Sequence, residues 1–177
     1  LKNVPRFEGD TLVVLDVSGS MTGRPAEIGS LFAAILAKSN NADFMTFSDN
    51  AQYRQLNIRN STLSIANNLN FAAGGTNFHA IFQTINQRYD RIIILSDMQG
   101  WIGGYSPKAS FDAYKAKYKA NPFIYSFDLQ GYGSLQFPEN KVFALAGFSD
   151  KIFDLMALLE TDPKAIINEI NKVTFKV

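Results

Sequence analysis

The sequence has no cysteine, a single histidine, a single tryptophan and no long hydrophobic run. Without cysteine the chain has no disulfide, no thiolate nucleophile and no cysteine-based zinc site. No apolar run approaches the roughly 20 residues that a membrane-spanning helix needs, so we expect no membrane span. No signal peptide is recognisable. Because the chain does not begin with Met, we interpret it as one domain of a longer protein.

Charge is also scarce and nearly balanced. The 177 residues include 17 basic and 16 acidic side chains, which gives a net charge of +1. This balance lacks the electrostatic footprint of proteins that bind nucleic acid or anionic membranes over a large surface. Hydrophobic residues make up 46% and charged residues 19% of the chain. These values are typical of a globular protein with one sizeable core.

Apolar strands alternate with amphipathic helices along the chain. Residues 11–17 and 91–95 are continuous apolar runs, as expected for parallel strands buried on both faces. The more polar residues 51–56 predict an antiparallel edge strand. Further strands are predicted at 43–47, 122–129 and 141–146, a loop at 130–140, and helices after Pro25, at 61–71, and after Asn77, Ser106-Pro107, Ser149 and Thr161.

The alternation of strands and helices predicts an α/β fold. Right-handed crossovers give a Rossmann-like, doubly wound and mostly parallel sheet, with one antiparallel edge strand. We expect residues 1–10 to be a lead-in or linker and residues 11–177 to form one domain. No internal repeat or low-complexity tract is visible in the sequence.

Oxygen-bearing side chains follow the two most apolar strands. Open α/β sheets bind ligands at the carboxyl ends of their strands, where the chain places Asp16 and Asp97. We expect these strands to be neighbours; two adjacent carboxylates repel each other unless a divalent cation lies between them. Hydroxyls from Ser18, Ser20 and Thr76 complete an all-oxygen set that favours Mg²⁺, with Mn²⁺ or Ca²⁺ as alternatives. At least one coordination position stays open for an external carboxylate or phosphate.

Each part of this motif has a simpler interpretation when it is taken alone. The Asp-x-Ser-x-Ser at 16–20 is also typical of a capped turn between a strand and a helix. The Gly-Gly-Thr at 74–76 is a common turn before a helix, and the Ser-Asp at 96–97 is an ordinary strand end. The occurrence of all three, in this order and beside these strands, favours the metal site.

Two enzyme-like alternatives fit the sequence less well. A Mg²⁺-dependent phosphoryl-transfer enzyme with Asp16 as nucleophile would have a second aspartate two positions later, where this chain has Ser18. It would also need a lysine near Asp97, and none is evident. A nucleotide-binding Rossmann domain is disfavoured because the loop after the first strand has neither a Gly-x-Gly-x-x-Gly nor a P-loop pattern.

The metal motif resembles that of von Willebrand factor A (vWA) domains with a metal-ion-dependent adhesion site. The signature of those domains is Asp-x-Ser-x-Ser, then a Thr, then an Asp at the end of the next central strand. This chain matches it without substitution at Asp16, Ser18, Ser20, Thr76 and Asp97. The resemblance covers essentially the whole chain. It implies a Rossmann-like binding module, not an enzyme, whose metal completes its shell with an acidic residue of a partner protein.

A narrower resemblance is to the C-terminal A domain of Ro (TROVE-module) RNA-binding proteins. It depends on residues 16–21, 74–77 and 147–155. In that family the domain follows a ring of helical repeats that binds small non-coding RNA and misfolded RNA. The resemblance implies a helical-repeat module upstream and contact with RNA through the parent protein. We also expect a cytoplasmic location. The alternative is a vWA module of an unrelated protein-assembly complex.

Four side chains are candidates for a partner-binding rim around the metal. Trp101, Tyr105 and Tyr132 lie in glycine-containing loops that leave the same edge, and such aromatic residues are favoured interface anchors. The alternative for Trp101 is packing over the core. His79 either contacts an anionic ligand or is a solvated helix residue. It is a poor general base, because no nucleophile or orienting partner is recognisable beside it.

A cluster of lysines and tyrosines lies in the helix predicted after Pro107. Basic and aromatic side chains together can bind single-stranded nucleic acid. At helical spacing, tyrosines more often pack and lysines are solvated. The residues concerned are Tyr114, Lys115, Lys117, Tyr118 and Lys119.

Overall fold

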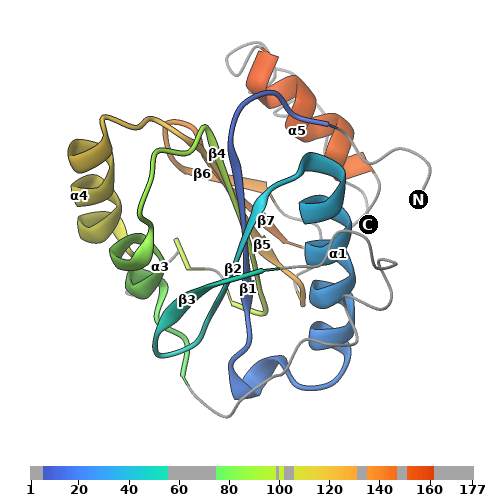
Figure 1. Ribbon diagram of the computed structural model, residues 1–177. Coiled ribbons are helices and arrows are strands. Elements are labelled where there is room, and N and C mark those ends of the chain that lie inside the picture. Colours follow the sequence, from blue (N-terminus) through green and yellow to red (C-terminus); the bar gives the residue numbers. More distant parts are fainter. Residues whose placement is uncertain are drawn as a thin grey trace.

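The fold has three layers, with one sheet between two groups of helices (Figure 1). The computed structural model describes residues 6–55, 75–98, 100–101, 106–130, 135–146 and 151–161. The strands are β1 (Thr11–Asp16), β2 (Asp43–Phe47), β3 (Ala51–Arg54), β4 (Arg91–Ser96), β5 (Phe123–Asp128), β6 (Leu135–Glu139) and β7 (Val142–Ala146). The helices are the short 3-10 turn η1 (Gly19–Met21), α1 (Arg24–Asn40), α3 (Phe78–Thr84), α4 (Lys108–Tyr118) and α5 (Lys151–Thr161).

The seven strands form one mixed sheet in the order β3-β2-β1-β4-β5-β7-β6. The five central strands, in the order β2, β1, β4, β5 and β7, pair in parallel with their neighbours. At the two edges, β3 pairs antiparallel with β2, and β6 pairs antiparallel with β7. The predicted fold class, a mostly parallel vWA-like Rossmann sheet, is therefore confirmed. The predicted helix at 61–71, Ser149 before α5, and the helix predicted after Thr161 lie outside the described residues.

One expectation about the sheet was wrong. The sequence predicts a loop at 130–140 and a single antiparallel edge, but residues 135–139 form the second antiparallel edge strand, β6. Pro138 obscured it, because proline cannot donate to a strand ladder. The ladder is irregular between Gln136 and Glu139, which is where an edge strand tolerates proline.

The two faces of the sheet bury separate sets of apolar side chains. All six residues of β1 and all six of β4 are buried, as their continuous apolar sequences predict. One core cluster joins the sheet to α1 and α5, through residues such as Leu36 and Met156. The other joins it to α3 and α4, through residues such as Ile81 and Phe111. Figure 1 shows the two helix pairs on opposite sides of the sheet.

Helix α1 begins and ends where the sequence provides the signals. Pro25 lies in its first turn, where a missing N–H costs no hydrogen bond. The helix ends at Asn40, and the next residue, Asn41, adopts the left-handed conformation with φ 48°. This places the amino end of α1 directly after η1 and the residues of the predicted metal motif.

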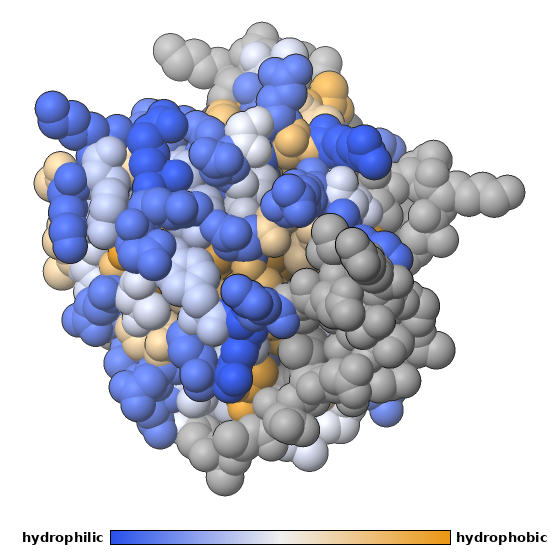
Figure 2. Space-filling model, in the orientation of Figure 1, coloured by the Kyte–Doolittle hydropathy of each residue, from blue (hydrophilic) through white to orange (hydrophobic). Residues whose placement is uncertain are grey.

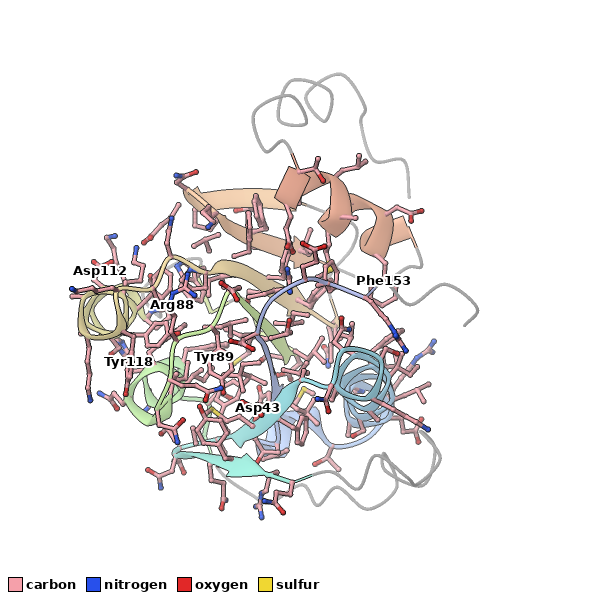
Figure 3. All side chains as sticks on the ribbon, turned by 45° about the horizontal axis from the view of Figure 1, so that its top comes forward. Asp43, Arg88, Tyr89, Asp112, Tyr118 and Phe153 are labelled. Atoms are coloured by element: carbon pink, nitrogen blue, oxygen red, sulfur yellow. The ribbon has the colours of Figure 1, made fainter. Side chains whose placement is uncertain are left out.

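Polar networks lie at the amino ends of the strands, opposite the predicted metal site. Tyr89 donates a 2.7 Å hydrogen bond to Oδ2 of Asp43, and the two side chains lie together in Figure 3. Arg91, at the start of β4, is 3% exposed and pairs with Glu160 of α5. Its Nη1 also donates to Thr11 Oγ1 at 2.7 Å. The Arg91–Glu160 pair holds α5 against the sheet.

The described surface is mostly hydrophilic in the view of Figure 2, where hydrophobic residues form only small separate patches. Leu158 is the large hydrophobic side chain that stands out among the described residues, at 55% exposed. Within the described part of the chain, no helix combines the length and hydropathy needed to cross a bilayer.

Candidate metal centre

The predicted metal ligands meet at the carboxyl edge of the sheet. β1 and β4 are hydrogen-bonded neighbours, with Leu15 opposite Leu95. Asp16 therefore ends one strand beside the point where Asp97 follows the other. The prediction that the two most apolar strands are neighbours is confirmed.

Asp16 is fully buried and held from two sides. Its Oδ1 accepts a hydrogen bond from the Ser18 N–H at 2.8 Å, and its Oδ2 accepts one from Ser96 Oγ at 2.6 Å. Ser96 is itself fully buried, and its Oγ accepts the Met98 N–H at 3.1 Å. The carboxylate is thus oriented before any ligand binds. Sequence reasoning assigned no role to Ser96, although it precedes Asp97.

The three hydroxyls link the remaining ligands into one chain. Thr76 Oγ1 donates to Ser18 Oγ at 3.0 Å, and the Ser18 and Ser20 hydroxyls are 3.1 Å apart. Ser20 Oγ then donates to Asp97 Oδ1 at 3.2 Å. Asp16 joins this chain through the Ser18 N–H. The fold therefore brings together all five side chains that the sequence selected.

The electrostatics of this cluster favour a cation. Burial raises the pKa of Asp16 above its ordinary value of 3.8, against the opposing hydrogen bonds from Ser18 and Ser96. The negative charge of Asp97 raises the pKa of Asp16 further. Neither carboxylate has a Lys or Arg partner among the described residues. The cluster thus holds two acidic groups without a compensating positive charge.

The spacing of the oxygens also fits a small hard cation. In an octahedral Mg²⁺ site each oxygen lies about 2.1 Å from the metal, so adjacent oxygens are about 3 Å apart. The hydroxyl and carboxylate oxygens from Thr76 to Asp97 are spaced at 3.0, 3.1 and 3.2 Å. Hydroxyl and carboxylate oxygens are the donors that Mg²⁺ prefers. The residues present therefore fit the metal that the resemblance implies.

The rim candidates have different outcomes. The interpretation of Trp101 as a partner contact needs correction, because its side chain is 5% exposed and packs edge-on against Phe82 and Phe111. Its hydrophobic ring is used in the core between α3 and α4. Tyr105 and Tyr132 lie outside the described residues.

His79 is half-buried at the start of α3. Its backbone N–H donates to the side chain of Asn77, which caps this helix. Its ring Nδ1 lies 2.6 Å from Ser110 Oγ of α4. The imidazole therefore joins two helices, and its contact with a ligand stays a prediction.

The lysine and tyrosine cluster of α4 is largely engaged in its own helix. Tyr114 is buried, and the Lys115 amine lies 4.4 Å from the centre of the Phe111 ring and 3.6 Å from Asp112. The Lys117 amine lies 5.3 Å from the centre of the Tyr118 ring. These contacts favour the packing interpretation over an open nucleic-acid surface.

No protein-family model matches the sequence, and no curated protein matches it. Among solved structures, the fold is similar to that of the Ro (RSR) protein of Deinococcus radiodurans, with a TM-score of 0.63 and 23% identity over 84% of this chain. It is also similar to proximal thread matrix protein 1 of the mussel byssus, with a TM-score of 0.52 and 16% identity over 86% of this chain and 44% of that one. An aerotolerance-related membrane protein of Bacteroides fragilis aligns with a TM-score of 0.46 and 14% identity over 67% of this chain and 66% of that one.

The likeness to the Ro protein concerns a part of that protein. The aligned region is 33% of the Ro chain, so this chain spans about a third of its length. At 23% identity the likeness shows the fold and leaves the activity open. The resemblance found in the sequence is therefore confirmed for the fold: this chain has the α/β architecture of a region of a Ro protein.

Proposed function

We propose that this chain is a vWA-type binding module that holds Mg²⁺ and binds an acidic group of a partner protein. The observation that supports it is the linked cluster of two carboxylates and three hydroxyls at one edge of the sheet. The metal would be held by Asp16, Ser18, Ser20, Thr76 and Asp97. When bound, the cation supplies a positive centre with an open position for an external carboxylate.

The cluster suits binding better than catalysis. Asp16 has no exposed surface, and both of its oxygens accept hydrogen bonds, so it is poorly placed to attack a substrate. Three of the five oxygen donors are neutral hydroxyls. The bound cation therefore keeps affinity for one more anionic oxygen, which a partner supplies.

The likeness to a Ro protein suggests the wider setting. We infer that the chain is the vWA-like part of a Ro-like, cytoplasmic RNA-binding protein, with a helical-repeat module upstream that contacts small non-coding RNA. The aligned region, about a third of the Ro chain, supports this inference. Sequencing the whole gene tests it: a gene without helical repeats would favour a vWA module of an unrelated assembly.

Calorimetric titration of Mg²⁺ into the metal-free protein tests the metal site. We expect the unaltered protein to bind one ion and the Asp16→Ala variant to lose binding. Asp128→Ala is the matched control, because Asp128 ends β5 at the same edge but lies outside the cluster. Equal Mg²⁺ binding by Asp16→Ala and the unaltered protein would contradict the proposal.

A second measurement addresses the acidic partner. Fluorescence anisotropy with a labelled glutamate-containing peptide should show binding that requires Mg²⁺ and is lost in EDTA. Binding that persists in EDTA would remove the metal from recognition. Hydrolysis of phosphate esters that depends on Asp16 would instead favour the phosphoryl-transfer alternative.

A further inference from the structure

A turn after β2 holds the loop that carries Thr76. The Ser48 carbonyl accepts the Asn77 N–H at 2.8 Å, and Oδ1 of Asp49 accepts the Gly75 N–H at 3.1 Å. The Asn77 side-chain amide also donates to the Asp49 carbonyl at 3.3 Å. Thr76 therefore lies between two anchored residues. Asp49 supplies the side chain that anchors Gly75, the residue directly before Thr76.

The contact between Asp49 and the loop is unusually close. A Cβ atom at position 75 would lie 2.7 Å from Oδ1 of Asp49, a distance that real Cβ atoms do not adopt. Gly75 is therefore required for the carboxylate to reach the backbone N–H. The next residue is Thr76, whose Oγ1 donates to Ser18 Oγ at 3.0 Å. One short path thus connects the Asp49 carboxylate to the candidate metal centre.

We propose that Asp49 is a positioning residue of the metal centre. Its carboxylate fixes the Gly75 amide and so holds the Thr76 hydroxyl beside Ser18. This inference rests on the proposed metal-binding function. Asp49 does not act as a third carboxylate ligand, since no three Asp, Glu or His side chains of the described part are grouped closely enough to hold an ion. Residues behind the ligands commonly set metal affinity by orienting them.

Mg²⁺ titration of position-49 variants tests this role. Asp49→Ala should weaken Mg²⁺ binding about tenfold, because the Gly75 amide loses its acceptor. Asp49→Asn keeps an oxygen acceptor and should bind Mg²⁺ nearly as the unaltered protein does. If Asp49→Asn weakens binding as much as Asp49→Ala, the negative charge of Asp49 matters and its position does not, which overturns the proposal.

Asp90→Ala is a matched control at the opposite edge. The Oδ2 of Asp90 accepts the Asp10 N–H at 2.8 Å, the same kind of carboxylate-to-backbone bond. This variant should lose thermal stability to a similar extent as Asp49→Ala, with Mg²⁺ affinity unchanged. A purely structural role of Asp49 would give the same pattern for Asp49→Ala, and that result would overturn the proposal.

A double-mutant cycle identifies the path of action. If Asp49 acts through Thr76, Asp49→Ala should cause no further loss of Mg²⁺ affinity in a Thr76→Ala background. Additive losses would overturn the proposal.

The metal-site hypothesis and the hypothesis about Asp49 fail in different ways. An unaltered protein that does not bind Mg²⁺ refutes the metal site and the role of Asp49 together. Binding that Asp49→Ala leaves unchanged refutes the role of Asp49 alone.

Discussion

Ser96 of β4 donates a 2.6 Å hydrogen bond to Oδ2 of Asp16 on the adjacent strand β1. Both side chains are fully buried. The Ser96 Oγ also accepts the Met98 N–H, which fixes the hydroxyl on the strand end. A hydrogen bond to a carboxylate is stronger than one between neutral groups, and burial increases its value. Ser96 therefore orients a predicted metal ligand without belonging to the predicted ligand set.

Ser96→Ala should lower both stability and metal affinity. We expect the free energy of unfolding to fall by about 1–3 kcal/mol, because a buried carboxylate loses a donor. Mg²⁺ affinity should fall about tenfold, since Asp16 loses its orienting partner. Urea unfolding and calorimetric titration measure the two effects.

Ser126→Ala provides the comparison for Ser96→Ala. Ser126 lies on β5 and is also fully buried, but its Oγ has no hydrogen-bond partner in the described structure. Its removal should leave the free energy of unfolding unchanged or raise it, because a buried unpaired hydroxyl is unfavourable. A loss in Ser126→Ala equal to that in Ser96→Ala would mean that the hydrogen bond to Asp16 is not the cause.

Asp16→Asn should separate stability from function. In the folded protein the pKa of Asp16 is raised above 3.8, first by burial, so ionisation of this group disfavours the folded state. The protonated Asp16 carboxyl therefore stabilises the folded state below the pKa of the unfolded chain. This contribution is lost as the pH rises through the raised pKa of the folded protein. Asp16→Asn avoids that loss and keeps an acceptor for the Ser18 N–H. In EDTA at neutral pH it should therefore unfold at a higher temperature than the unaltered protein.

The order of stabilities should reverse when Mg²⁺ is added. Only the unaltered protein can gain stability from the ion, because ligand binding favours the folded state. Thermal unfolding with and without Mg²⁺, at neutral pH and near pH 4, measures both effects, and the difference in EDTA should shrink at the lower pH. A less stable Asp16→Asn protein in EDTA at neutral pH would contradict this account.

The sequence contains enough information to predict most of the sheet and the five clustered side chains. Two continuous apolar runs predict buried neighbouring strands, and strand direction alone then brings Asp16 and Asp97 to one edge. The hydroxyls follow from their spacing to these strands. This reasoning succeeds because each step depends on local pattern and on a general rule of α/β topology.

Other features depend on contacts that a linear sequence does not reveal. In the sequence Asp49 is typical of a turn, but its carboxylate accepts a hydrogen bond from the Gly75 N–H, 26 residues away. The loop around Trp101 contains glycines that suggest exposure, whereas the ring packs between Phe82 and Phe111. The edge strand β6 was missed because proline, here Pro138, is rare inside a strand. In each case tertiary contacts override a correct local tendency.

The ion pair between Arg91 and Glu160 should be important for stability. Their side chains are 4% and 15% exposed, and Arg91 Nε donates to Glu160 Oε2 at 2.6 Å. Glu160→Ala leaves a buried guanidinium without its partner and should cost about 3–5 kcal/mol of unfolding free energy. Arg88→Ala is the control, because the exposed Arg88–Asp90 pair should contribute at most about 1 kcal/mol. Similar losses measured by urea unfolding would show that burial does not strengthen the Arg91 pair.

Tyr114 should make the fold sensitive to alkali. Burial raises the pKa of Tyr114 to about 12, from an ordinary value of 10.0, although a hydrogen bond from the Tyr89 N–H opposes the shift. Between these values the unfolded chain releases the proton while the folded chain keeps it, so stability falls as the pH rises through this window. Tyr114→Phe should be less stable at neutral pH by about 1 kcal/mol, since the hydroxyl donates to the Gln87 carbonyl and accepts from Tyr89. It should also lose stability less steeply above pH 10, because the titrating group is gone.

Urea unfolding at a series of alkaline pH values measures how steeply the stability of Tyr114→Phe falls with pH. A slope equal to that of the unaltered protein would show that other buried groups, such as Tyr125, cause the alkaline loss.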